Sequence, residues 1–300
     1  MPSSPSAPEQ AGRVVSGFGR HQLVEADDGR RVRCNARSSA GDIVVGDRVA
    51  WQPSGDEGVI TAVQPRRNLF HRQDEWRVKT FAANVDQLFI VVAAQPVFSE
   101  SQLARSLVAA AAASIPARVI LNKTDLPEIE AAQLRLEPYA AMEVDIVRVA
   151  LKTDTAAALD RLAPLAAGQA TLVLGPSGAG KSTLVNALVR DAGAQVGEIS
   201  QALRTGRHTT TATHWYWIDE TKTAALVDSP GFQQFGLRHV AADQLAGLMP
   251  DLAAQATTCR FYNCLHVHEP GCGVRAAAEA GVITPSRYRI YLEILDELKG

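Results

Sequence analysis

Residues 170–188 constrain the fold of this chain more than any other stretch. The apolar run Leu172-Val173-Leu174 predicts a strand, the segment 175–183 is a glycine-rich loop, and the residues after it have the pattern of a helix. Such a loop turns backbone N–H groups inward at the positive end of the helix, where phosphates bind. In this interpretation Lys181 reaches the terminal phosphates and Ser182 is a ligand of Mg²⁺. A glycine-rich turn without a ligand is the alternative, and the flanking strand and helix argue against it.

The whole loop is expected to surround the phosphates. Its residues are Gly175, Pro176, Ser177, Gly178, Ala179, Gly180, Lys181, Ser182 and Thr183.

Length and composition indicate a globular protein of about two or three domains, with 300 residues of which 46% are hydrophobic. The formal net charge of −2 does not favour a polyanion partner for the chain as a whole, so a nucleic-acid surface has to be local. Residues 1–10 are rich in Pro and Ser and predict a disordered tail rather than a signal peptide. No apolar run is long enough to predict a membrane span.

Short alternating runs between Gly12 and Pro65, punctuated by Gly and Asp, predict a small β-barrel. Such a barrel can bind oligonucleotides through basic and aromatic side chains. The candidates are Arg30, Arg31, Arg33, Arg37, Arg66, Arg67, Phe18, Trp51 and Phe70. A solvated surface over core aromatics is the alternative, and the nearly balanced charge of this region favours it.

From Val85 onward, buried strands alternate with helical patterns, which predicts a parallel α/β sheet. The first strand is expected at Leu88 to Val92, a helix at Glu100 to Ser114, and the second strand at Arg118 to Leu121. The alternation continues to the glycine-rich loop and stops after Asp228, where a separate small module begins.

Asn122-Lys123-Thr124-Asp125 directly follows a buried strand, at the strand end where doubly wound sheets bind ligands. The Asp125 carboxylate can accept hydrogen bonds from the N1–H and the 2-amino group of guanine, and adenine offers no such pair. Because an unpaired buried carboxylate is costly, this residue predicts strong selection of guanine over adenine.

Two further segments complete a nucleoside triphosphate site. Asp228, after the apolar run 224–227, is expected to support Mg²⁺ through water, and the Gly231 N–H is expected to sense the γ-phosphate. The polar segment 206–211 contains three threonines, and Thr210 is the one expected to close over Mg²⁺.

Cys259, Cys264, His266 and Cys272 have the spacing Cys-x₄-Cys-x-His-x₅-Cys. Three thiolates and an imidazole form a closed tetrahedral set for one structural Zn²⁺ in a reducing compartment, with His268 as an alternative to His266. Cys34 is isolated and is expected to be a small buried residue. Arg and Tyr side chains of the helix expected from Pro285 are interpreted either as an RNA-facing surface or as packing residues.

The order of these motifs is unusual, because the guanine segment precedes the phosphate loop, whereas in ordinary GTPases it comes later. With the barrel, the segment Gly206-Arg207-His208-Thr209-Thr210-Thr211 and the cysteine cluster, the chain resembles the ribosome small-subunit-dependent GTPase A family from about Gly12 to its end. The resemblance implies a circularly permuted GTPase that binds the small ribosomal subunit and its rRNA, hydrolyses GTP to GDP and assists late maturation. It also implies a cytoplasmic protein without a membrane partner, and we expect a monomer.

The resemblance also nominates a catalytic side chain. Ordinary small GTPases place a water-orienting Gln after the Asp-x-x-Gly motif, but this chain has Phe232 there. The resemblance points to His208 as the substitute, since an imidazole can polarise water near neutral pH. An RNA contact or a loop cap is the alternative role for His208. The N–H of Ala150 is a further candidate contact to the guanine oxygen.

The expected organisation is a tail at 1–11, an OB-type barrel at 12–68, a circularly permuted GTPase domain at 69–236 and a helical zinc module at 237–300. Two other function classes remain open at this point. One is another P-loop enzyme, such as an ATPase or a small-molecule kinase, and the other is a non-catalytic RNA-binding module with nucleotide as a structural ligand.

Overall fold

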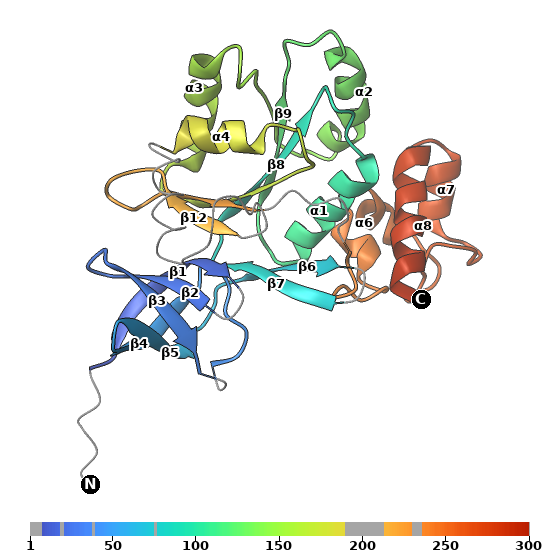
Figure 1. Ribbon diagram of the computed structural model, residues 1–300. Helices are drawn as coiled ribbons and strands as arrows, with labels where there is room; N and C mark the ends of the chain where they lie inside the picture. Colours follow the sequence, from blue (N-terminus) through green and yellow to red (C-terminus); the bar gives the residue numbers. More distant parts are fainter. Residues whose placement is uncertain are drawn as a thin grey trace.

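The computed structural model describes residues 8–18, 21–37, 40–74, 77–189, 213–229 and 236–299. Figure 1 shows a small barrel near the N-terminus, a sheet flanked by helices above it, and a group of helices at the C-terminus. This arrangement confirms the predicted fold class of a barrel, a permuted α/β domain and a cysteine-containing helical module. None of the helices in these ranges is both long enough and apolar enough to span a membrane.

The N-terminal barrel has five strands, β1 to β5. They are Gln10–Phe18, His21–Ala26, Arg31–Ala36, Arg48–Ser54 and Glu57–Val63. The strands pair in the order β1-β2-β3-β5-β4, and β4 pairs back with β1, so the barrel is closed. Because β1 begins at Gln10, regular structure starts two residues before the expected boundary at Gly12.

The barrel interior contains Trp51 and the thiol of Cys34, both fully buried. Gly58 lies against them, and a Cβ atom there would approach Cys34 Sγ to 2.5 Å. Burial raises the pKa of Cys34 to about 12, so the thiol stays neutral and behaves as the expected small apolar residue.

A hairpin of β6 (Leu69–Asp74) and β7 (Arg77–Ala83) follows the barrel. Its strands pair with each other in a separate two-stranded sheet, and in Figure 1 the hairpin runs beneath α1 towards the C-terminal helices. The alternating pattern of the sequence did not predict these strands.

The central sheet contains β8 to β13. They are Gln87–Ala93, Ala117–Asn122, Ile146–Arg148, Ala170–Leu174, His214–Trp217 and Ala225–Asp228. The order is β10-β9-β8-β11-β13-β12, with parallel neighbours except for β12, which is antiparallel to β13. The base-binding strand β9 precedes the phosphate-loop strand β11 in the chain but lies only one strand, β8, away from it. This strand order is that of the circularly permuted sheet that the motif order predicted.

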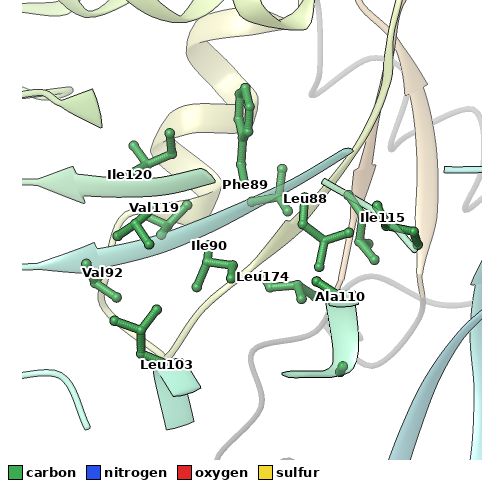
Figure 2. Close-up of a cluster of buried hydrophobic side chains, with 14 of the residues drawn as sticks. Leu88, Phe89, Ile90, Val92, Leu103, Ala110, Ile115, Val119, Ile120 and Leu174 are labelled. Atoms are coloured by element: carbon green, nitrogen blue, oxygen red, sulfur yellow. The ribbon is translucent and has the colours of Figure 1, made fainter. Parts of the chain in front are cut away.

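Four helices cover this sheet: α1 (Glu100–Ala112), α2 (Ile129–Ala140), α3 (Thr155–Ala166) and α4 (Lys181–Leu188). Figure 1 shows α1 and α2 on the side of the C-terminal helices and α3 and α4 on the other side. Every residue of β8 is buried, as the continuous apolar run predicts, and Figure 2 shows Leu88 and Ile90 of β8 close to Leu174. Local signals set the helix starts: the Ser99 side chain accepts from the Gln102 N–H and the Asp154 side chain from the Ala157 N–H.

The C-terminal module consists of a 3₁₀ turn η2 (Leu245–Leu248) and helices α6 (Pro250–Ala256), α7 (Gly273–Glu279) and α8 (Pro285–Lys299). Arg287 of α8 is only 3% exposed and forms a bidentate ion pair with Asp251 of α6 at 2.8 and 2.9 Å. Its guanidinium also lies 5.0 Å from the ring centre of Tyr139 on α2. The packing interpretation of Arg287 is therefore correct, and the RNA-facing interpretation is wrong for this residue.

Candidate functional site

The phosphate loop joins β11 to α4 as the sequence predicts. Gly175 and Gly180 have φ values of +147° and +110°, which favour glycine. They also lie too close to their neighbours for a side chain. A Cβ at Gly175 would lie 2.2 Å from the Val91 carbonyl oxygen, and one at Gly180 would lie 2.1 Å from Asn122 Nδ2.

Lys181 begins α4 and folds back over the loop. Its Nζ donates to the carbonyl oxygens of Gly175 at 2.7 Å and Pro176 at 2.8 Å. Burial lowers the pKa of Lys181, while the nearby carboxyl group of Asp228 acts in the opposite direction. The ammonium group is thus already in a poorly hydrated position at the loop, where a phosphate oxygen gains most from its charge.

Asn122 connects three segments of the site. Its Nδ2 donates to the Ala179 carbonyl oxygen at 2.9 Å, and its Oδ1 accepts from the Leu151 N–H at 3.1 Å. Both side-chain groups are therefore used within the protein, and Asn122 holds the phosphate loop against the segment that follows β10. The next residue, Lys123, has a φ of +61°, which turns the chain sharply at the end of β9.

The segment after β10, in which the sequence nominated the Ala150 N–H, contributes to the site through its later residues. Leu151 donates its N–H to Asn122, and Thr153 donates its N–H to the Ala150 carbonyl oxygen. Lys152 and Thr153 line the same cavity as Asp125, and Ala150 is absent from the described lining. A backbone N–H needs no particular side chain, so only the position directly after the edge strand β10 signals this contact.

Asp228 ends β13, beside the phosphate-loop strand. Burial raises its pKa to about 6, and the charge of Lys181 limits the rise. The following Ser229 is buried and donates its Oγ–H to the Val173 carbonyl oxygen at 2.8 Å. This bond fixes the chain as it leaves the sheet.

These elements enclose a cavity of about 960 Å³. Its described lining is Asn122, Lys123, Asp125, Leu126, Lys152, Thr153, Ser177, Gly178, Gly180, Lys181, Ser182, Thr183, Asp228 and Ser229. The structure thus brings the predicted base and phosphate segments together around one space large enough for a nucleotide. Thr124, Gly175, Pro176 and Ala179 were predicted to bind GTP but are absent from that lining. Thr124 instead donates its N–H to the Val149 carbonyl oxygen. His208, Thr210 and Gly231 lie outside the described residues.

A second candidate site brings together Cys259, Cys264, His266 and Cys272, whose potential ligand atoms all lie within 4.8 Å of one another. Cys259 Sγ and Cys272 Sγ are 3.9 Å apart, and His266 Nδ1 lies 3.5 Å from Cys259 Sγ and 3.4 Å from Cys272 Sγ. Tetrahedral Zn²⁺ with ordinary bond lengths requires separations of about 3.8 Å between sulfurs and about 3.5 Å between sulfur and nitrogen. The four residues therefore fit a zinc ion. His268 is exposed and lies outside this cluster, so the geometry favours His266.

The loop that carries these ligands is held by α8 and by Glu269. The hydroxyl groups of Tyr288 and Tyr291 donate to the carbonyl oxygens of His266 at 2.7 Å and Leu265 at 2.8 Å. Burial disfavours the charge of Glu269, but N–H groups of the loop donate to its carboxylate and lower its pKa to about 2. The hydroxyl groups of Tyr288 and Tyr291 thus bind the backbone of the cysteine loop to α8.

Among the side chains that the structure describes, the candidate aromatic residues Trp51 and Phe70 do not form a stacking surface. Trp51 is 1% exposed and Phe70 is fully buried, so both are core residues. Arg31 pairs with Glu25 and Arg66 with Asp47 at 2.9 and 2.7 Å. These contacts favour the interpretation of the barrel side chains as core aromatics and internally paired charges.

The site and the fold together define a class of protein. A glycine-rich phosphate loop shares one parallel sheet with an Asn-Lys-Thr-Asp segment that precedes it in the chain, which makes this a circularly permuted P-loop GTPase. Residues 63–238 match the RsgA GTPase family. Because this match covers more than half of the 300 residues, the chain belongs to that family.

Relatives and solved structures agree with this assignment. The small ribosomal subunit biogenesis GTPase RsgA of Variovorax paradoxus is 56% identical over 292 residues, covering 96% of this chain and 92% of the relative. The protein of the same name from Bordetella pertussis is 49% identical, with 97% of each chain covered. The crystal structure of YjeQ from Thermotoga maritima has a TM-score of 0.72 and 29% identity, covering 98% of this chain and 99% of that one. YloQ, described as a circularly permuted GTPase, has a TM-score of 0.70 and 25% identity, covering 100% and 98% of the two chains.

Proposed function

We propose that this GTPase binds the small ribosomal subunit and assists its late maturation. GTP hydrolysis then drives release of the protein from the subunit. Two full-length relatives named for small ribosomal subunit biogenesis, at 56% and 49% identity, support this role. The observation that carries the GTPase part of the proposal is that Asp125, Lys181 and Asp228 line the same cavity. The expected partners are the subunit, its rRNA and GTP or GDP, and the protein acts as a monomer in the cytoplasm.

Guanine is recognised by Asp125 and by the backbone after β10. The Asp125 carboxylate accepts from the N1–H and the 2-amino group of the base. The N–H groups of Leu151 and Thr153 are already used, and Ala150 is absent from the described cavity lining. We therefore assign the contact to the guanine oxygen to the Lys152 N–H. The base is therefore read by one side chain and one main-chain donor.

The phosphates lie on the glycine-rich loop, with Lys181 exchanging its two carbonyl acceptors for phosphate oxygens. Ser182 and Asp228 line the cavity beside this position, and their hydroxyl and carboxylate oxygens are the donor types that Mg²⁺ prefers. Ser182 and Thr210 are the proposed direct ligands, and Asp228 acts through water. Mg²⁺, when bound with GTP, offsets charge that develops on the β- and γ-phosphates.

Water attacks the γ-phosphate, and the bond to the GDP leaving group breaks. His208 is the proposed group that polarises this water, and the Gly231 N–H is the proposed sensor of the γ-phosphate. The Phe232 side chain, at the position of the usual Gln, has no polar atom that can orient water. Slow intrinsic turnover, accelerated by the partner, follows from that substitution.

The cysteine cluster is proposed to bind one structural Zn²⁺ through Cys259, Cys264, His266 and Cys272. Four protein ligands leave no open coordination position, which suits a structural ion rather than a catalytic one. Its proposed role is to stabilise a module with a small core of its own.

The deciding experiment is GTP turnover by the full chain with and without purified small subunits. Stimulation of the parent at least about tenfold, lost in His208→Ala, is expected for a group that acts on the attacking water. Absence of stimulation contradicts the subunit role, and equal stimulation of His208→Ala contradicts the catalytic role of that residue. Equal affinity for ATP and GTP contradicts the guanine site.

A further inference from the structure

One row of residues crosses four adjacent strands between the barrel and the phosphate loop. Ser16 of β1 lies opposite His214 of β12, His214 lies opposite Asp228 of β13, and Asp228 lies opposite Val173 of β11. Side chains directly opposite each other in neighbouring strands project from the same face of a sheet. Ser16, His214 and Asp228 therefore share one face, with His214 in the middle.

The barrel joins the central sheet through this row. Ser16↔His214 is the register pair between β1 and β12, and an irregularity in the β1–β2 pairing between Val14 and Ser16 precedes it. Ser16 is fully buried, and its Oγ lies 2.8 Å from His214 Nδ1. The contact is a hydrogen bond between the Ser16 hydroxyl and the imidazole of His214, whose pKa is lowered by burial.

Neighbouring contacts hold the rest of β12 against the barrel. Glu25 of β2 accepts from Trp217 Nε1 at 2.8 Å and from Lys222 Nζ at 2.6 Å. The Arg13 guanidinium of β1 lies 4.3 Å from the ring centre of Trp215. Both ends of this short strand thus contact the barrel, and β12 has little freedom to shift on its own.

Asp228 lies between β12 and β11 and is paired with both strands. It is the last residue of β13, and it faces His214 across the antiparallel pair. It also lies close enough to Lys181 for the two charges to influence each other's pKa. The β12–β13 pairing therefore links the backbone position of Asp228, beside the phosphate-loop strand, to that of His214.

We propose that Ser16 is a positioning residue for the GTPase site, because its hydrogen bond to His214 fixes Asp228 where it supports Mg²⁺. The barrel thereby completes the metal site of a domain that begins after it in the chain. This inference rests on the proposed role of Asp228 towards Mg²⁺, but it does not require the ribosomal partner.

The test measures binding rather than turnover. Affinity for a non-hydrolysable GTP analogue is determined by calorimetry over a series of Mg²⁺ concentrations, for the full-length parent, Ser16→Ala, Asp228→Asn and the double variant. Ser106→Ala is the matched control, because Ser106 is also buried but bonds within α1 to the Gln102 carbonyl oxygen. We expect Ser16→Ala to raise the Mg²⁺ concentration at which half of the Mg²⁺-dependent gain in nucleotide affinity is reached. The expected rise is about threefold to tenfold, which corresponds to the loss of one hydrogen bond. Affinity without Mg²⁺ and the behaviour of Ser106→Ala should match the parent.

The double variant tests whether Ser16 acts through Asp228. Ser16→Ala should have no further effect when Asp228→Asn is already present. A second pair of variants at His214 separates the hydrogen bond from packing: His214→Asn keeps a polar partner for Ser16 and should resemble the parent, whereas His214→Phe should resemble Ser16→Ala. A parent-like Mg²⁺ requirement in Ser16→Ala, with a raised one in Asp228→Asn, overturns the positioning role alone. A parent-like requirement in Asp228→Asn overturns the metal role of Asp228 and the positioning role with it.

Discussion

Asp125 and Asp228 are two cavity carboxyl groups with different tasks. Asp125 follows β9 and lines the cavity together with residues that follow β10, where it can meet a neutral base. Asp228 lies beside the phosphate loop, where burial disfavours its charge and Lys181 favours it. The same side-chain chemistry therefore gives base recognition at one place and metal support at the other.

Replacing Asp125 by Asn should invert its hydrogen-bonding preference. The Asn amide can donate to the 2-oxo group of xanthine, whereas it can no longer accept from both donors of guanine. We expect Asp125→Asn to lose about 10²-fold in GTP affinity, since unpaired polar groups remain in the site. Calorimetric titration with GTP and with xanthosine triphosphate checks this, and a variant that still prefers GTP would refute the base contact.

Asp228 should make nucleotide binding depend on pH. Its folded-state pKa of about 6 lies above the ordinary value of 3.8, so the nucleotide-free protein loses stability from this group as pH rises from about 4 to about 6. Binding of Mg²⁺ and nucleotide favours the ionised carboxylate and should release part of a proton near pH 6. Affinity is therefore expected to fall as pH is lowered through about 6.

Proton release is measured by titrating the same Mg²⁺–nucleotide in buffers of different ionisation enthalpy. Asp228→Asn is the control, because the nucleotide's own protonation is common to both proteins. Equal proton release by the parent and Asp228→Asn at pH 6 would show that another group titrates.

At the scale of elements, the cysteine loop depends on both its ligands and α8. The tyrosine hydroxyl groups and Glu269 hold the backbone of the loop, while the four ligand atoms converge on one point. A bound Zn²⁺ would join the segment before α7 to the N-terminus of α7, where Cys272 is the cap residue. Metal binding is thus coupled to the folding of this module.

The two histidines of this loop provide a matched pair of variants. His266→Ala should abolish stoichiometric zinc, because it removes a buried ligand, whereas His268→Ala should retain one zinc per chain since His268 is exposed. Elemental analysis of the purified proteins measures the metal, and thermal unfolding with a chelator measures its effect on stability. Zinc loss in both variants, or in neither, would contradict the assigned ligand set.

Sequence patterns predicted the elements whose signals are local. The role of Gly175 and Gly180 in the phosphate loop could be predicted, because few other residues tolerate their backbone angles and close contacts. The sequence nominated the N–H of Ala150 rather than that of Lys152 for the proposed base contact, because any residue supplies a backbone N–H and no side chain marks the position. The Ser16–His214 contact was missed because it joins strands 198 residues apart in the chain.

For the C-terminal helix, the sequence left two interpretations open, an RNA-facing surface and packing residues. Arg287 and Tyr291 have the composition of an RNA-binding helix face, yet both are buried. Hydrophobic periodicity does not distinguish a charged side chain that is paired in the interior from one that faces solvent. The hairpin at residues 69–83 was not predicted, because its polar segment around His71 to Asp74 lacks a clear alternating pattern.

At the scale of the whole molecule, Arg287 links the C-terminal module to the GTPase domain. It pairs with Asp251 in its own module and contacts Tyr139 of α2 across the boundary. Burial disfavours the charge of Arg287, but the bonds to Asp251 raise its pKa. A second ion pair, Arg105–Glu297 at 2.6 Å, joins α1 to α8.

Removing Arg287 should therefore destabilise the assembly of the two parts. We expect Arg287→Ala to lower the free energy of unfolding by about 3 kcal/mol, because it leaves Asp251 without its partner inside the protein. Arg289→Ala is the control: Arg289 is 69% exposed and pairs with Glu293 at 3.7 Å, so its loss should cost less than about 0.5 kcal/mol. Equilibrium unfolding in urea compares them, and equal losses would contradict a structural role for the buried pair.

Strand β1 also has a consequence for the order in which the chain folds during synthesis. It forms ladders with β2 and β4 inside the barrel and with β12 outside it. All five barrel strands are complete by Val63, long before His214 leaves the ribosome that makes the chain. A finished barrel therefore presents a ready edge on which β12 can pair as soon as it is translated. The earliest part of the polypeptide then acts as a template for β12, the edge strand of the nucleotide-binding sheet.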